Sequence, residues 1–162
     1  MTGKDFEDEL LELLRKYVDE RGVVMRRRQE FRMRGGDFQA DQYVDFMVDS
    51  PDSELYLGVE AKKATASSSP AFYFSNYFPV EQIKSQFEYG ERSGRTMYTI
   101  VMVRDYDGED VMVLYPLEYF YSLAVEEGEK SVGWDELVDA GIVVGDTISK
   151  EDFDAADALI NE

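Results

Sequence analysis

The chain has 162 residues, with 35 acidic and 17 basic side chains, so its formal charge at pH 7 is −18. It contains neither histidine nor cysteine. These absences exclude disulfide bonds, thiolate nucleophiles, zinc–thiolate sites and any catalysis or metal binding through imidazole. The chemistry that remains uses carboxylate, lysine and tyrosine groups, together with hard metal ions that prefer oxygen ligands.

The length and a hydrophobic content of 44% predict a single globular domain with a packed core. No window approaches the 18 consecutive apolar residues of a membrane span, and the N-terminus lacks the apolar core of a signal peptide. We therefore expect a cytoplasmic protein that is not associated with a membrane.

Hydrophobic periodicity and turn residues predict an α/β fold, with a mixed central β-sheet flanked by helices. In chain order the expected elements are a helix at 5–20, strands at 22–33, 43–48 and 55–62, a helix at 79–94, strands at 97–103 and 111–114, and helices at 116–125 and 151–160. We expect one domain over residues 1–162, with its core at about 3–126. The sequence does not indicate the role of the extension at 127–162.

Positive charge is concentrated in one segment near the N-terminus. Residues 21–36 hold six of the ten arginines and a single acid, for a net charge of +5 against −23 in the rest of the chain. The candidates for contacts to a nucleic-acid backbone are Arg26, Arg27, Arg28, Arg32 and Arg34. The alternative is a solvated strand whose arginines pair with surface carboxylates.

One carboxylate of the first helix falls on its apolar side. A helical wheel sets Glu7 inside the arc formed by Phe6, Leu10 and Leu14. A carboxylate that faces a core is costly unless it is hydrogen-bonded, paired or bound to a cation. The alternative is that Glu7 lies in the first turn, where the helix dipole favours an acid.

Two more acids lie within apolar strands. Asp45 falls on the face opposite that expected for Val44, Phe46 and Val48, because side chains alternate along a strand. Glu60 shares a face with Lys62, and a hairpin through the turn residues 50–53 would bring Asp45 close to Glu60.

Two neighbouring carboxylates repel each other unless a cation lies between them, and Mg²⁺ prefers such oxygen ligands. Lys62 would then act on the attacking water and counter charge on a phosphate. Gly58, two residues before Glu60 on the same face, is expected to leave open space above the strand. The alternative is an ordinary Glu–Lys pair on an exposed sheet face.

The aromatic run at 72–78 is a candidate interface element, although such runs are more often part of a core. Tyr73 and Tyr77 are candidates for stacking on the exposed bases of a DNA branch point.

These acids and the lysine fall in a pattern that resembles the PD-(D/E)XK nuclease superfamily and, within it, the archaeal Holliday junction resolvases. The resemblance rests on Gly3 and Glu7 in the first helix, the arginine-bearing strand at 24–28, Val44-Asp45-Phe46, and the sequence Leu-Gly-Val-Glu-Ala-Lys at 57–62. It covers residues 3 to about 63, and the order of elements agrees as far as Pro116. It implies a restriction-endonuclease-like core.

The resemblance also implies a function. A member of this family would be a Mg²⁺- or Mn²⁺-dependent endonuclease that cuts four-way DNA junctions symmetrically as a homodimer. Glu7, Asp45, Glu60 and the backbone carbonyl of Ala61 would bind the metal, and Lys62 would act on the water. The alternatives are another nuclease of the superfamily, acting on linear or flap DNA, and a non-catalytic acidic protein that mimics DNA or binds a nuclease. We interpret the acidic body as adaptation to high salt in an archaeal, halophilic host.

Overall fold

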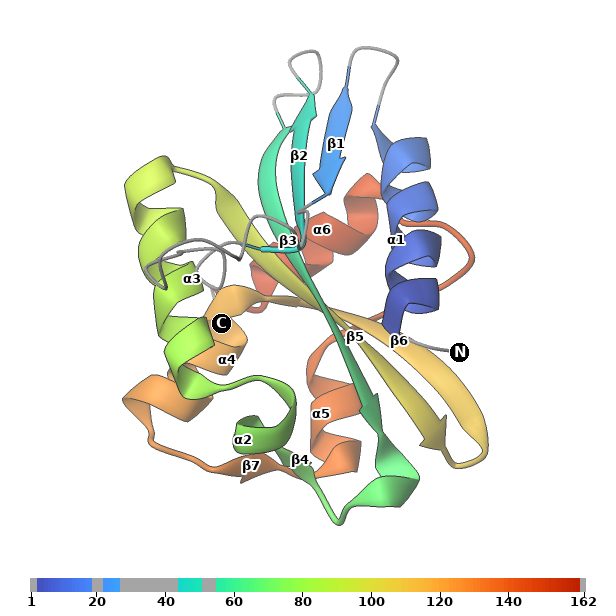
Figure 1. Cartoon of the computed structure of the whole chain (residues 1–162), viewed down its shortest axis with the longest axis vertical. Coiled ribbons are helices and arrows are strands. Elements are labelled where there is room, and N and C mark those ends of the chain that lie inside the picture. The colour runs from blue at the N-terminus through green and yellow to red at the C-terminus, as the bar shows by residue number, and fades with distance from the viewer. Residues whose placement is uncertain (1–2, 19–21, 27–43, 51–54, 161–162) are drawn as a thin grey trace, which may run out of the picture.

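A six-stranded sheet forms the centre of the molecule (Figure 1). The computed structural model describes residues 3–18, 22–26, 44–50 and 55–160. The strand order is β1-β2-β3-β5-β6-β8, and β4 and β7 form a separate two-stranded sheet. The strands are β1 Val23–Arg26, β2 Phe46–Ser50, β3 Leu55–Thr65, β4 Phe72–Tyr73, β5 Thr96–Tyr106, β6 Glu109–Pro116, β7 Ser131–Val132 and β8 Ile142–Val144.

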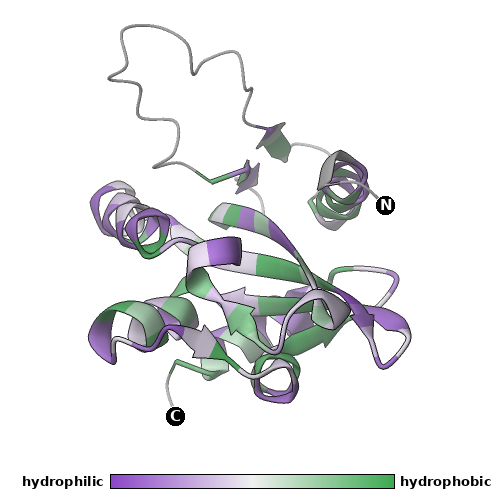
Figure 2. Cartoon of the chain, turned by 60° about the horizontal axis from the view of Figure 1, so that its bottom comes forward, coloured by the Kyte–Doolittle hydropathy of each residue, from purple (hydrophilic) through white to green (hydrophobic). Residues whose placement is uncertain are grey.

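Helices cover both faces of this sheet. The helices are α1 Gly3–Tyr17, α2 Phe74–Tyr77, α3 Val80–Ser93, α4 Leu117–Tyr121, α5 Trp134–Ala140 and α6 Lys150–Ala158, with short helical turns η4 Ala66–Ser68 and η5 Ser122–Glu126. Buried side chains of α1 and α6 pack on one face, around Phe6, Leu10 and Phe153. Those of α2 to α5 pack on the other, around Ile83 and Phe120. In Figure 2 the inner strands are largely green, whereas the helices show both colours, as amphipathic elements between core and solvent do.

The predicted mixed α/β fold is confirmed. All neighbouring strands of the main sheet are antiparallel except β3 and β5, which are parallel. A parallel pair needs a crossover connection, and α3 lies in it. As the sequence predicts, this helix begins after Pro79 and ends before Gly94. Gly94 has a left-handed φ of 80°, which is common just after a helix. The strand predicted at 22–33 is present as β1, while residues 27–43 lie outside the described residues.

The prediction that Val44 shares a face with Phe46 and Val48 is wrong. Phe46 and Val48 pack beneath α1, whereas Val44 packs on the opposite face, beside Met97. The reason is that β2 begins only at Phe46, so strict alternation does not extend back to Val44. The space expected above Gly58 is also filled, because a Cβ there would lie 2.7 Å from the sulfur of Met97 and 3.1 Å from Val44 Cγ2.

The C-terminal part of the chain contains elements that the sequence did not predict. Strand β8 pairs with β6 and so extends the main sheet by one strand, and α5 precedes it. The indole N–H of Trp134 donates to the carbonyl of Ser69 at 2.8 Å, which ties α5 to the turn after β3. The last helix begins in a capping box between Ser149 and Asp152, one residue before its predicted start. Among the helices of the described ranges, none combines the length and apolar character that a membrane span needs.

Candidate active site

Asp45 lies where the pairing of β2 with β3 stops. The register sets Phe46 opposite Val59, which brings Asp45 next to Glu60 and Ala61. Beyond Phe46 there is no paired strand residue to accept from the N–H of Ala61, and Oδ2 of Asp45 accepts it instead, at 2.9 Å. Asp45 is only 8% exposed. The hairpin therefore places the carboxylate of Asp45 against the backbone of β3, beside the residue that follows Glu60.

Glu60 is 2% exposed, and both of its carboxylate oxygens have hydrogen-bond donors. Its Oε1 accepts from Nε2 of Gln86 at 2.9 Å. Its Oε2 accepts from Nε2 of Gln82 at 3.3 Å and lies 3.2 Å from Nζ of Lys62. These donors offset the cost of burying a carboxylate, which is severe for an acid without partners.

Lys62 is held from three sides. Its Nζ contacts Glu60, donates to Oε1 of Gln82 at 2.6 Å, and lies 4.8 Å from the centre of the Phe78 ring. The ring face attracts a cation at this distance. With a side chain only 15% exposed, Lys62 does not form an ordinary surface pair with Glu60, so that alternative is excluded.

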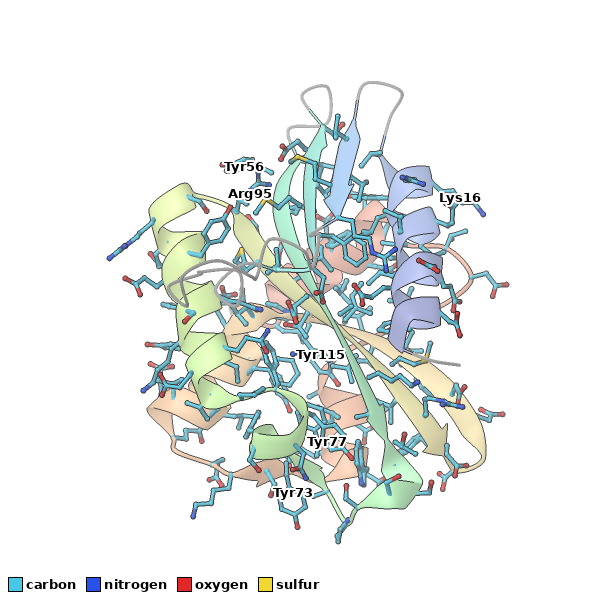
Figure 3. All side chains as sticks on the ribbon, viewed as in Figure 1. Lys16, Tyr56, Tyr73, Tyr77, Arg95 and Tyr115 are labelled. Carbon is cyan, nitrogen blue, oxygen red and sulfur yellow. The ribbon has the colours of Figure 1, made fainter. Side chains whose placement is uncertain are left out.

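Arg95 fixes the strands that carry these residues. Its guanidinium donates to Asp49 on β2 at 2.8 Å and to the carbonyl of Leu57 on β3 at 2.9 Å. It also stacks over the ring of Tyr56, 3.9 Å from the ring centre, and Figure 3 shows these two side chains together near the end of α3. One buried cation therefore links β2 and β3 to the loop between α3 and β5.

Glu7 lies apart from the two strand acids. Its carboxylate is 3.8 Å from a guanidinium nitrogen of Arg26, and that guanidinium also donates to Asp8 at 2.6 Å. Helix α1 packs against the face of the sheet opposite to α3. Within the described ranges, no three acidic side chains are grouped so that they could hold one metal ion.

Of the five arginines predicted to contact DNA, Arg26 lies within the described residues. The other four, Arg27, Arg28, Arg32 and Arg34, lie in the range 27–43, outside the described residues.

Three polar residues at this site were missed by the sequence analysis: Gln82, Gln86 and Thr99. Thr99 is paired with Glu60 in the register of β3 and β5. In the part of the chain that the structure describes, Oε1 of Gln86 and the hydroxyl of Thr99 are buried without a hydrogen-bond partner. A usable signal is the position of Gln86, three residues after Ile83 and at the border of the apolar side of its helix.

The residues present fit a hard divalent cation. The N–H and C=O of one residue in a strand point to the same side, so the carbonyl of Ala61 faces the edge where its N–H meets Asp45. Asp45, Glu60 and this carbonyl supply oxygen ligands only. Mg²⁺ is commonly bound through one or two carboxylates and retained waters, so two acids suffice. Buried oxygens without partners are uncommon in folded proteins, and those of Gln86 and Thr99 fit a site that binds a hydrated ion.

The aromatic run at 72–78 is mostly core. Phe72, Phe74 and Phe78 are at most 2% exposed. Tyr77 stacks on Phe72 with 5.1 Å between ring centres, so its ring is already used within the chain. Figure 3 labels Tyr73 and Tyr77, which both lie near the two-stranded sheet.

Comparison with known proteins gives a match in structure but none in sequence. No protein-family model matches the sequence, and no curated protein matches it. Among solved structures, the chain is similar to Hjc, a Holliday junction resolvase from the archaeal hyperthermophile Archaeoglobus fulgidus, with a TM-score of 0.53 and 15% sequence identity. The alignment covers 86% of this chain and 94% of Hjc. The chain therefore has the fold of an archaeal Holliday junction resolvase, the fold that the pattern of acids and lysine in residues 7–62 implies.

Proposed function

We propose that the protein is a metal-dependent DNA endonuclease that resolves four-way junctions by paired phosphodiester hydrolysis as a homodimer. The observation that carries this proposal is the burial of Asp45, just before β2, and of Glu60 with Lys62 on the neighbouring β3, in a fold shared with a junction resolvase. Fold alone does not fix a substrate, so the chemistry of this group has to support the activity.

Asp45, Glu60 and the Ala61 carbonyl would hold Mg²⁺ or Mn²⁺. A bound ion of this kind supplies a more acidic water and polarises the phosphodiester oxygens. Glu7 is proposed as a further ligand, and this role requires its carboxylate to leave Arg26 and to move towards Asp45 and Glu60 when the ion binds. Arg26 would keep its shorter contact, to Asp8.

Besides the metal ion, the proposed site has a positive charge from the protein itself, the ammonium group of Lys62. Gln82 and the ring of Phe78 fix its Nζ beside Glu60, so the side chain needs little reorganisation when DNA arrives. A preorganised cation is worth most where charge develops during the reaction. We assign to Lys62 the orientation of the attacking water and the stabilisation of charge on the phosphate.

The arginine segment is proposed to hold the DNA. Arg26, Arg27, Arg28, Arg32 and Arg34 would contact phosphates, which positions DNA without reading its sequence. Selection of a junction would come from the relative position of two active sites in the dimer. The acidic remainder of the chain is proposed to be an adaptation to high salt, where charge repulsion is screened within about 3 Å at 1 M ionic strength.

The test uses synthetic four-way junctions, linear duplexes and flaps, each with and without Mg²⁺ and at several salt concentrations. We expect paired symmetric cuts in the junction alone, only with metal, and lost in Glu60→Gln. Glu81→Gln is the matched control, because its side chain is 88% exposed at the start of α3. Equal cutting of duplexes or flaps would indicate a different nuclease of the superfamily. No cutting of any substrate with either metal would refute the proposal.

The dimer is tested separately by analytical ultracentrifugation at the concentrations used for cleavage. A mass of twice 18.6 kDa is expected. A monomer that still makes paired cuts would contradict the homodimer.

A further inference from the structure

Two glutamine side chains of α3 contact the acid and the lysine of the candidate active site. Gln82 and Gln86 are one helical turn apart, so both reach β3 from the same side of the helix. Together their amide groups donate to both oxygens of Glu60 and accept from Lys62. The two glutamines therefore help to set the orientation of both side chains.

The two contacts differ in their surroundings. Gln86 is 1% exposed, and its amide donates to Oε1 of Glu60 at 2.9 Å. Gln82 is half-buried and contacts Oε2, the oxygen that also faces Lys62. The amide of Gln82 therefore bridges Oε2 and Nζ at the more accessible side of the carboxylate.

We propose that Gln86 and Gln82 are positioning residues with opposite effects on the binding of a divalent cation by Glu60. Gln86 fixes the carboxylate so that Oε2 is presented to the ion. Gln82 occupies Oε2 and Nζ in the metal-free protein and gives up its contact to Oε2 when the ion binds. This inference rests on the proposed function, since it assumes that Glu60 is a metal ligand.

Each role has a distinct consequence. Without the amide of Gln86, the carboxylate loses its fixed orientation, and metal affinity falls by about 10- to 100-fold, as is usual when a partner of a metal ligand is removed. Without the amide of Gln82, one competitor for Oε2 is gone and metal affinity rises. Lys62 then loses its 2.6 Å acceptor, so cleavage slows although the metal binds more tightly. If the two glutamines had only a structural role, both substitutions would lower the metal affinity.

The experiment compares Gln82→Met and Gln86→Met, which keep the length of the side chain and remove the amide. Lys84→Gln is the control, because Lys84 lies on the exposed side of the same helix. Binding of Mn²⁺ to the full chain is measured without DNA by electron paramagnetic resonance. Thermal unfolding of the metal-free proteins and single-turnover cleavage of a four-way junction complete the comparison.

We expect Mn²⁺ affinity to fall in Gln86→Met, to rise in Gln82→Met and to stay unchanged in Lys84→Gln, with slower cleavage in both glutamine variants. If wild type binds Mn²⁺ and cuts junctions but Gln82→Met binds Mn²⁺ no more tightly, the inference is wrong and the proposed function stands. If wild type neither binds Mn²⁺ nor cuts DNA, the proposed function itself fails. Should Gln86→Met not fold, Gln82→Met decides alone, because Gln82 is the less buried of the two.

Discussion

The carboxylate of Asp45 accepts a hydrogen bond from the backbone N–H of Ala61, at 2.9 Å, just beyond the last paired residues of β2 and β3. The acid thus replaces a strand residue as the acceptor at this point of the sheet. Its position is set by the backbone of β3, the strand that carries Glu60 and Lys62. Asp45 therefore has a structural role and a proposed chemical role, and substitutions can separate them.

The first prediction concerns Asp45→Asn and Asp45→Ala. Asparagine keeps an oxygen that can accept from Ala61, so we expect little change in stability but a loss of cleavage of about 100-fold or more, because a metal-binding charge is removed. Alanine leaves a buried N–H without its acceptor, which costs about 1–3 kcal/mol. Urea unfolding measures the stability, and junction binding and cleavage assays measure the function. Cleavage by Asp45→Asn at the wild-type rate would contradict the metal role.

A second prediction tests how firmly the C-terminal strand is joined to the sheet. A Cβ at Gly141 would collide with Val113, with the ring of Tyr115 at 2.6 Å, and with the backbone carbonyl of Leu114 at 3.0 Å. We expect Gly141→Ala to lower the free energy of unfolding by about 1–3 kcal/mol, the usual cost of overpacking. Gly145→Ala is the matched control, because a Cβ there meets nothing within 4 Å.

Both glycine variants are compared by urea and thermal unfolding. Gly145→Ala should be neutral or more stable by up to about 1 kcal/mol, since alanine restricts the unfolded chain. Equal stability of the two variants would mean that β8 separates readily from β6.

The sequence predicts the elements that have clear ends and long periodic patterns. Helix α3 is bounded by Pro79 and Gly94, and both boundaries are found in the structure. Strand β8 has only three residues and a single buried side chain, Val144, so its pattern is too short to recognise. Its place in the sheet is decided by pairing with β6, a tertiary contact that a local pattern does not contain.

In the candidate site, too, some features follow from local patterns and others depend on tertiary contacts. Alternation along β3 correctly places Glu60 and Lys62 on one face, because strand periodicity is local. The hydrogen bond between Gln86 and Glu60 joins residues 26 positions apart, so no local rule predicts it. Val44 shows the limit of alternation itself, which holds only inside a strand, and the sequence does not mark that β2 begins at Phe46.

A third prediction concerns alkaline pH. Burial raises the pKa of Tyr115, and the neighbouring Tyr119 raises it further. The phenol donates to the carbonyl of Leu137, and Figure 3 shows Tyr115 in the interior of the molecule. Because the pKa is raised in the folded state above its ordinary value of 10.0, this tyrosine's contribution to stability is fully present below pH 10 and is lost as the pH rises further.

The measurement is the free energy of unfolding in urea between pH 8 and pH 11, for wild type and Tyr115→Phe. Above pH 10, each tyrosine that ionises only in the unfolded chain lowers the free energy of unfolding by about 1.4 kcal/mol more for every pH unit. We expect Tyr115→Phe to be less stable at pH 8, because the carbonyl of Leu137 loses its donor, and to lose stability less steeply above pH 10. Identical slopes would show that Tyr115 ionises in the folded protein.

The last prediction separates two roles of the arginine segment. If Arg27 and Arg28 contact phosphates, replacing each by alanine lowers the dependence of binding on salt by roughly one unit of slope, because fewer counterions are released. Arg92→Ala is the control, since the side chain of Arg92 is 79% exposed and pairs with Glu88 at the end of α3. Arg26→Ala has a further effect, because it removes the partner that Asp8 and Glu7 share.

Arg26→Ala therefore distinguishes a residue that binds DNA from one that only ties α1 to β1. A DNA contact predicts a smaller salt slope for junctions and duplexes alike, measured by fluorescence anisotropy from 50 mM to 1 M salt. A purely structural contact predicts an unchanged slope with lower thermal stability. Arg26→Ala also removes a cationic partner of Glu7. Tighter binding of Mn²⁺ by Arg26→Ala would therefore support Glu7 as a metal ligand. Unchanged Mn²⁺ affinity would contradict that role. If Glu7 must leave Arg26 to bind the ion, removing Arg26 should change the free energy of metal binding.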